Sequence, residues 1–361
     1  MRCKRRWALL FGALLSLGGC HREQASKSDA SAPGDGYLVR AKALGGAPLE
    51  FGVLGGRVVA AAELPRQSPV MELGQRFVVP AFIDSHVHLS YYPIAESLPA
   101  SGIVAAVDFA APLASLGQSV TLPLRRSGPM LTPPGGYPTQ SWGADGYGLE
   151  VGSAGEASAA VDRLLDAGAD FIKAPLFGEQ GLSDEALAAV TQRAHERGVR
   201  VAVHALGADD ALRAIRSQID ILAHTPTEAL SEQALAAFGE RTLVSTLAAF
   251  GGDAALANLR GLREHGARIL YGTDLGNTRE LGVQAREIEG LMAAGLDGAA
   301  IVRAGSADPA QFWGLSELGA LEPGKRASFL VLDQDPADNP LVLSTPHAVV
   351  VDGQLLTGSL R

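Results

Sequence analysis

The sequence predicts an α/β fold in which eight strands alternate with helices, as in a (β/α)8 barrel. Between about residues 81 and 320, short β-branched runs alternate with helical stretches such as "EASAAVDRLLDAG" and "DEALAAVTQRAHERG". That alternation is typical of successive βα units with a parallel sheet. Eight such units in about 240 residues match the size of a (β/α)8 barrel. The chain has 361 residues, 47% of them hydrophobic, which is enough for a large core.

The eight predicted strands are short apolar runs bounded by turn or helix signals. They are residues 81–86, 103–110, 128–131, 170–175, 200–205, 220–225, 242–246 and 268–274. Both flanks of this region are β-rich. Residues 37–80 contain several strand-like runs separated by Gly and Pro, and residues 327–333 and 347–356 are predicted strands on the C-terminal side.

The first nineteen residues predict an export signal. Basic residues precede an apolar stretch at 7–17 that is short for a membrane-spanning helix. The signal ends in "LGGC", which resembles a bacterial lipobox and implies cleavage before Cys20 and lipidation of its sulfur. An ordinary signal peptide or an uncleaved anchor are the alternatives. Residues 20–36 are predicted to be a flexible tether. His21, in place of Asp, favours the outer membrane of the cell envelope.

Charge and cysteine content narrow the classes of partner. The net charge of −9 argues against nucleic acid, whose phosphates require a basic surface. Cys3 and Cys20 are the two cysteines, and Cys3 would leave with the signal, so the processed chain would hold no disulfide. We expect a small-molecule substrate, and contact with the membrane through the lipid on Cys20 alone.

The first predicted barrel strand ends in a pair of histidines, "IDSHVHLS". Because side chains alternate across a strand, His86 and His88 point the same way and bring two imidazoles to one place. Two histidines cannot saturate a metal ion, so further ligands would have to come from comparable positions elsewhere in the chain.

Four more polar residues lie late in, or at the end of, predicted barrel strands. They are Lys173, His204, His224 and Asp274. Each residue alone has an ordinary explanation. A histidine can be hydrogen-bonded at the surface or in the core, a lysine can extend its ammonium to solvent, and an aspartate can cap the next helix. Because a barrel gathers the carboxyl ends of its strands into one ring, the set together predicts a metal centre there. The remaining histidines lie in the tether, in helices or in the C-terminal β region.

The order His-x-His, Lys, His, His, Asp resembles the amidohydrolase superfamily, in particular its imidazolonepropionase-like and prolidase-like members. The segments "GADFIKAPLFGEQGLSDEALAAVTQRAHERGVRVAVHALG" and "GALEPGKRASFLVLDQDP" are similar to that family as well. The resemblance implies a distorted (β/α)8 TIM barrel over 81–324. It also implies a small composite β-sandwich built from residues 37–80 and 325–361.

The resemblance also implies a binuclear site. His86, His88 and Asp274 would bind one divalent metal ion, and His204 and His224 a second. Lys173, N-carboxylated by CO2, would bridge them, since a lysine ammonium has no lone pair for a metal. The donors suit Zn²⁺ best, while Mn²⁺, Fe²⁺ and Co²⁺ are also compatible. A hydroxide bridging the metals would attack the scissile carbonyl, with Asp274 moving the proton to the leaving nitrogen.

Two positions depart from the family pattern. Tyr137 stands where many relatives have histidine after paired glycines, and Leu206 stands where several have a polar aromatic residue or histidine. Tyr137 is a candidate catalytic residue that donates to the developing oxyanion, or it packs within its loop. Arg279 either binds a substrate carboxylate or is solvated.

The leading hypothesis is a metal-dependent hydrolase of a C–N bond in a small cyclic amide, N-acyl amino acid or dipeptide. A lactonase or esterase with the same binuclear site is the nearer alternative. A non-catalytic, ligand-binding surface lipoprotein is the more distant one. The substrate depends on loops whose conformation the sequence does not give.

Overall fold

The computed structural model describes residues 36–178 and 180–360. The predicted export signal, Cys20 and residues 20–35 of the predicted tether lie outside this part of the chain. The described residues from Gly36 onward belong to one compact unit. This unit contains both the predicted β-sandwich and the predicted barrel, and the boundaries between those two parts stay predictions. No helix in the described part of the chain combines the length and apolarity that a membrane crossing requires.

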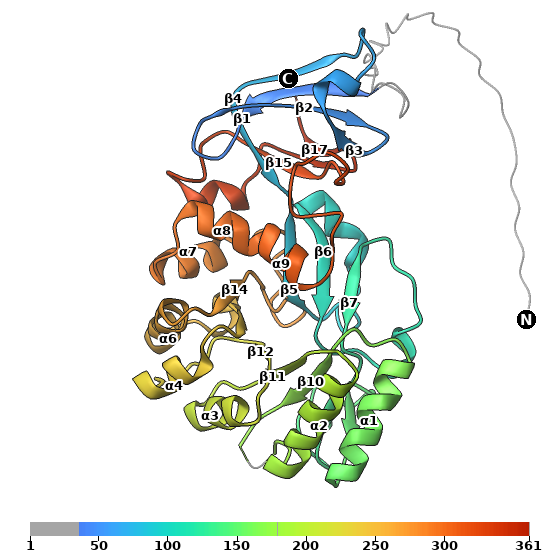
Figure 1. The fold of residues 1–361 in the computed structure, drawn as a ribbon, viewed down its shortest axis with the longest axis vertical. Coiled ribbons are helices and arrows are strands. Elements are labelled where there is room, and N and C mark those ends of the chain that lie inside the picture. The colour runs from blue at the N-terminus through green and yellow to red at the C-terminus, as the bar shows by residue number, and fades with distance from the viewer. Residues whose placement is uncertain (1–35, 179, 361) are drawn as a thin grey trace, which may run out of the picture. The chain divides into compact units, whose positions relative to one another are not determined.

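The two β-rich flanks come together in one seven-stranded sheet (Figure 1). Its order is β17-β16-β15-β4-β1-β2-β3. The strands are β1 (Tyr37–Lys42), β2 (Pro48–Leu54), β3 (Arg57–Val59), β4 (Val70–Pro80), β15 (Phe329–Leu332), β16 (Ala348–Val351) and β17 (Gln354–Gly358). The run 347–356, predicted as one strand, is instead a hairpin. Asp352 and Gly353 both have positive φ there, as a tight two-residue hairpin turn requires.

This sheet is curled, so that its two halves share a core. The long strand β4 pairs with β1 along one stretch and with β15 along another. In a flat sheet β2 and β15 would lie about 14 Å apart, at about 4.8 Å per strand. The rings of Phe51 in β2 and Phe329 in β15 nevertheless meet edge to face at 5.6 Å. The composite β region predicted from the two flanks is therefore a single folded-over sheet.

The central part of the chain is an α/β arrangement of parallel strands and surrounding helices (Figure 1). Its strands are β5 (Phe82–Val87), β6 (Ile103–Asp108), β7 (Leu124–Arg126), β8 (Met130–Thr132), β9 (Gly148–Glu150), β10 (Ile172–Pro175), β11 (Val201–His204), β12 (Ile221–Leu222), β13 (Thr242–Val244) and β14 (Arg268–Leu270). They form three sheets, β5-β6-β7, β8-β9 and β10-β11-β12-β13-β14. The described residues thus show no single closed sheet, and the arrangement is consistent with a distorted barrel.

The third predicted strand differs most from the structure. In place of one strand at 128–131, β7 and β8 are separated by a break at Gly128, which has φ of +71°. β7 pairs with β6, whereas β8 pairs with β9. The predicted strands at 220–225 and 268–274 are also shorter, at β12 and β14. Beyond β14 the chain still hydrogen-bonds to β5, since Ser85 N–H donates to the carbonyl of Tyr271 at 2.9 Å.

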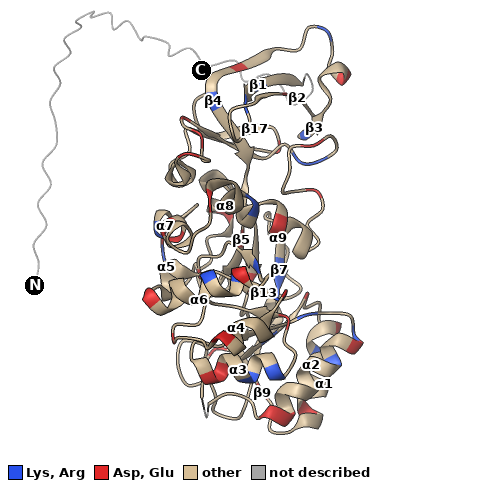
Figure 2. Cartoon of the chain, turned by 60° about the vertical axis from the view of Figure 1, so that its left-hand side comes forward, with Lys and Arg blue, Asp and Glu red and all other residues tan. Residues whose placement is uncertain are grey.

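The helices pack on the outside of these strands (Figure 1). They are α1 (Ala154–Asp166), α2 (Asp184–Glu196), α3 (Ala208–Arg216), α4 (Glu232–Phe238), α5 (Leu247–Phe250), α6 (Asp253–Glu264), α7 (Ala285–Ala293), α8 (Gly298–Gly305) and α9 (Ala307–Phe312). Short 3₁₀ turns are η1 (Ala61–Glu63), η2 (Ala95–Ser97), η3 (Pro99–Ser101), η4 (Leu113–Ser115) and η5 (Pro340–Ser344). Figure 2 shows charged residues spread over helices such as α1 to α4. Asp162 of α1, for example, pairs with Arg193 of α2 at 2.8 Å.

Candidate metal centre

Two histidines and an aspartate converge at the carboxyl end of β5. The Nε2 atoms of His86 and His88 lie 3.3 Å apart. Asp274 Oδ1 lies 3.5 Å from Nε2 of His86 and 3.0 Å from Nε2 of His88. All three side chains are buried, and their ligand atoms form a cluster able to hold a metal ion. The alternation argument for His86 and His88 therefore describes their geometry correctly.

The backbone beyond β14 brings Asp274 to this point. Its N–H donates to the carbonyl of His86 at 2.9 Å, and its φ is +55°. Gly272, two residues earlier, lets this segment pass close to β5, because a Cβ there would lie 2.4 Å from Val244 and 3.1 Å from Cβ of His86. Asn277 Nδ2 donates to both carboxylate oxygens of Asp274 at 3.1 Å. These contacts fix the carboxylate against rotation.

Hydrogen bonds determine which imidazole nitrogens are available to a ligand. Nδ1 of His86 lies 2.9 Å from the carbonyl of Ala223, which only accepts, so Nδ1 carries the proton and Nε2 has a free lone pair. Nδ1 of His224 lies 3.0 Å from the hydroxyl of Thr246. Nδ1 of His88 and Nε2 of His204 are buried without a hydrogen-bond partner among the described residues. Buried polar atoms normally have a partner, so the free Nε2 of His204 indicates a ligand, whereas His88 offers the cluster its other nitrogen, Nε2.

The other predicted ligands lie against the same cluster. The ring centroids of His86 and His224 are 4.5 Å apart, and those of His204 and His224 are 4.7 Å apart. Phe109 stacks on His86 at 4.1 Å, and the Nζ of Lys173 lies 4.7 Å from the centre of the Phe109 ring. Lys173 is 1% exposed, and the described residues form no ion pair with it. Of the six predicted metal ligands, the structure thus brings together the ligand atoms of His86, His88 and Asp274, and places Lys173, His204 and His224 as buried neighbours of that cluster.

Burial lowers the pKa of three of the histidines and of Lys173, and so favours their neutral forms. Desolvation, reinforced by Lys173, keeps the pKa of His86 well below its usual value and lowers the pKa of His204 to about 3. Desolvation also keeps the pKa of His224 well below its usual range. The pKa of Lys173 is well below that of a free lysine because burial outweighs the attraction of Asp274. Neutral imidazoles are the forms that bind metals.

Tyr137 lies beside the histidines on the loop after β8. Its ring centroid is 5.5 Å from that of His204, and Nε1 of Trp142 donates to its hydroxyl oxygen at 2.8 Å. Burial raises the pKa of Tyr137 above its usual value, so the phenol stays protonated at neutral pH. Trp142 also meets the His88 ring edge to face at 5.3 Å. Arg279 is exposed and lies over the ring of Tyr92, with its guanidinium carbon 4.3 Å from the ring centre.

Sequence reasoning missed several residues that hold the site together. The buried carboxylate of Asp84 accepts the N–H of His86 at 3.1 Å, and the N–H and hydroxyl of Thr273 at 3.1 and 2.5 Å. It therefore ties β5 to the segment that carries Asp274. Phe109 and Thr246 were missed as well. Asp84 had a signal, because a carboxylate inside an apolar strand is unusual, whereas Phe109 resembles any other core residue.

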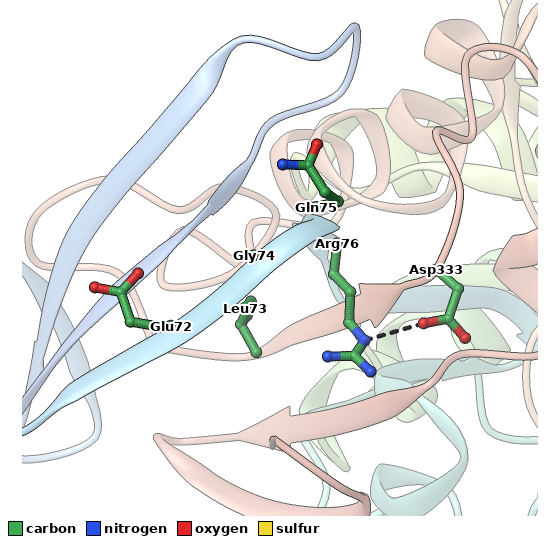
Figure 3. Close-up of a pocket in the computed structure, with 6 residues that line it drawn as sticks. All are labelled: Glu72, Leu73, Gly74, Gln75, Arg76 and Asp333. Carbon is green, nitrogen blue, oxygen red and sulfur yellow. Dashed lines mark hydrogen bonds and ion pairs between the residues drawn. The ribbon is translucent and has the colours of Figure 1, made fainter.

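A shallow surface pocket beside β4 is the alternative place for a ligand. It is lined by Glu72, Leu73, Gly74, Gln75, Arg76 and Asp333 (Figure 3). Nε of Arg76 donates to Asp333 at 3.0 Å across it. Its charged groups are solvent-accessible and none of the six predicted ligands contributes to it, so we assign the functional site to the histidine cluster.

Comparisons with known proteins agree with the geometry. The model of the amidohydrolase family matches residues 95–356. A Xaa-Pro dipeptidase with methionine bound in its active site has a similar structure, with a TM-score of 0.74 at 21% identity, over 89% of this chain and 99% of that one. An ochratoxinase of A. niger has a TM-score of 0.71 at 17% identity, over 90% of this chain and 96% of that one.

A molinate hydrolase has a TM-score of 0.71 at 17% identity, over 89% of this chain and 94% of that one. At these identities the structural likeness bears on the fold alone. Curated protein sequences provide no match. The family model, in contrast, covers well over half of the chain and includes Lys173, His204, His224 and Asp274. The chain therefore belongs to the amidohydrolase family.

Proposed function

We propose that this protein is a metal-dependent hydrolase that cleaves an amide C–N bond in a small cyclic amide, N-acyl amino acid or dipeptide. The convergence of His86, His88 and Asp274 on one point carries the proposal. Membership of the amidohydrolase family supports a hydrolase of this class.

The donor set fits divalent metal ions. Imidazole and carboxylate suit Zn²⁺ best among the common metals. The unpartnered, buried Nε2 of His204 supports the same conclusion, since this nitrogen lacks a protein partner in the described structure. His86, His88 and Asp274 would hold one ion, and His204 and His224 a second. When bound, such ions lower the pKa of water and polarise a carbonyl.

Lys173 would serve this site as a carbamate. Burial favours its neutral amine, which can add CO2 by forming an N–C bond and releasing a proton to solvent. The resulting carbamate offers two oxygens as metal ligands. Its negative charge offsets part of the positive charge of two cations. An unmodified lysine would face strong repulsion from those cations.

The protein's own residues would then move the protons. The carboxylate of Asp274, held by Asn277, accepts a proton from the attacking water and passes it to the leaving nitrogen as the C–N bond breaks. The hydroxyl of Tyr137 accepts from Trp142, which leaves its own proton free to donate to the carbonyl oxygen. The products are a carboxylic acid and an amine.

A metal analysis combined with a substrate screen tests this function. We expect about two Zn²⁺ per chain in the wild type, and we expect His86→Ala with His88→Ala to lose bound metal and all hydrolysis. His195→Ala with His265→Ala is the matched control, because both are histidines paired with carboxylates in exposed contacts. Full activity after chelation would contradict the proposal, and turnover of lactones but not amides would favour an esterase.

We further propose that the chain is exported and anchored to the cell envelope, in the outer membrane, by a lipid on Cys20. The lipobox-like "LGGC" supports this. Cys20→Ala should move the protein from the membrane to the soluble fraction and abolish its labelling by a fatty-acid analogue. An unchanged distribution and unchanged processing of that variant would refute the lipid anchor.

A further inference from the structure

The short helix α5, whose Phe250 packs on the ring of His224, has an unusual N-terminal cap. α5 follows Thr246, which has φ of +47°. A helix-capping threonine ordinarily has an extended backbone and accepts an early backbone N–H. With its left-handed backbone Thr246 makes no such bond, and its hydroxyl lies 3.0 Å from Nδ1 of His224. The helix must satisfy its first turn by other means.

Glu287 of α7 takes over that cap. Its Oε2 accepts the N–H of Ala248 at 2.7 Å, and its side chain is fully buried. Desolvation raises the pKa of this carboxyl to about 7, opposed in part by the Ser245 hydroxyl and the Ala248 N–H. A carboxylate is a costly choice for a core position, so its hydrogen bond to α5 explains its presence better than packing does.

One turn further along α7, Gly290 lets this helix pack closely against the same end of α5. A Cβ on Gly290 would lie 2.8 Å from both Cβ and Cδ1 of Leu247. Positions three apart share a helix face, so Glu287 and Gly290 both point at the first turn of α5. The far end of α5 reaches the site too, where Phe250 packs on the His224 ring at 4.6 Å.

We propose that Glu287 is a positioning residue for the metal centre, acting through Thr246 on His224. By accepting the N–H of Ala248 it holds the first turn of α5 in place, and with it the Thr246 hydroxyl that lies 3.0 Å from Nδ1 of His224. That contact occupies Nδ1 and orients the ring, which leaves Nε2 as the nitrogen available to a metal. The inference rests on the proposed function in taking His224 as a ligand.

Zinc titration of the metal-free protein tests this role. We expect Glu287→Ala to weaken one of two zinc sites about 10-fold or more, whereas Glu287→Gln, which keeps an acceptor oxygen, stays within about threefold of wild type. Thr246→Val should weaken the same site and Thr246→Ser should restore it. The double variant Glu287→Ala with Thr246→Val should bind no more weakly than Thr246→Val alone, because both changes break one chain of contacts.

A second measurement separates positioning from simple stabilisation. In ¹⁵N NMR of the metal-free protein, the shifts of the His224 ring nitrogens should differ between wild type and Glu287→Ala, because the hydrogen bond between Nδ1 and Thr246 is weakened in the variant. Asp297→Ala is the matched control, since Asp297 caps α8 by accepting the N–H of Ala300 at the same 2.7 Å. It should lower the melting temperature without changing zinc affinity.

The outcomes distinguish this inference from the proposed function. If Glu287→Ala loses stability as Asp297→Ala does and keeps wild-type zinc binding and wild-type shifts of the His224 ring nitrogens, the positioning role is wrong. If Glu287→Ala does not fold, Gly290→Ala, which would press on Leu247 of α5, takes its place, and normal zinc binding in that variant overturns the proposal. If the wild type binds no zinc, the proposed function fails, and the ring-nitrogen shifts still decide the role of Glu287.

Discussion

The carboxylate of Asp274 lies 3.0 Å from Nε2 of His88, although the two residues come from the last and the first strand regions of the α/β part of the chain. The backbones of the two segments are also hydrogen-bonded, because the N–H of His88 donates to the carbonyl of Leu275 at 2.7 Å. The candidate site is therefore built on the seam where β5 meets the segment after β14.

Asp274→Asn should be close to inactive yet folded. Asparagine keeps the shape and one oxygen but cannot accept a proton at neutral pH, so we expect turnover to fall about 10²-fold or more, the scale of losing a general base. Bound metal, measured by elemental analysis, should fall only in part. Near-normal turnover would assign the proton transfer to another residue.

Lys173→Ala should lose one or both metal ions and most activity. Lys173→Arg should fail as well, because a guanidinium stays charged and cannot take up CO2. Acetate or formate at high concentration should restore part of the turnover of Lys173→Ala by supplying the missing oxygens. Lys325→Ala is a suitable control, since that lysine donates to a backbone carbonyl in an exposed contact. Normal activity of Lys173→Arg would exclude the carbamate.

Tyr137→Phe tests the departure from the family pattern. Loss of one oxyanion donor costs about 10²–10³ in kcat, so we expect a fall of that order with metal content and KM little changed. Trp142→Phe is the matched control, because it removes the 2.8 Å hydrogen bond to the Tyr137 hydroxyl but keeps the phenol. Equal activity of Tyr137→Phe and wild type would mean that Tyr137 only packs.

Glu287 should make stability fall as pH rises. Its carboxyl pKa is raised from 4.5 to about 7 by burial, so between these values the folded chain holds a proton that the unfolded chain releases. At about 1.4 kcal/mol per pKa unit, the free energy of unfolding should lose roughly 3 kcal/mol from this group across that window. Glu287→Gln should lack this loss.

Denaturant unfolding of wild type and Glu287→Gln at pH 5 and pH 8 measures the effect. The difference in unfolding free energy between the two proteins should shift in favour of the variant at the higher pH. A difference that does not change with pH would show that the Glu287 carboxyl titrates alike in the folded and unfolded chain.

The local pattern of the sequence determined much of the site. The strand period of two placed His86 and His88 on one side, and the position of His204 at the end of an apolar run located it correctly at the end of β11. These features depend on neighbouring residues only, which is why periodicity reveals them. The β character of both flanks was read from their composition as well, whereas their union in one region was implied only by the resemblance to the amidohydrolase superfamily.

Tertiary structure decided what depends on contacts between distant segments. The break at Gly128, the hairpin at Asp352 and the curled single sheet arise from how strands pair, which the order of apolar residues leaves open. The same is true of the ring of Phe109, which contacts both His86 and Lys173. It is true as well of the hydrogen bonds that join Glu287 to α5 and Thr246 to His224. A buried phenylalanine or a helical glutamate has no local signature of its neighbours, because its role is set only when the chain closes around it.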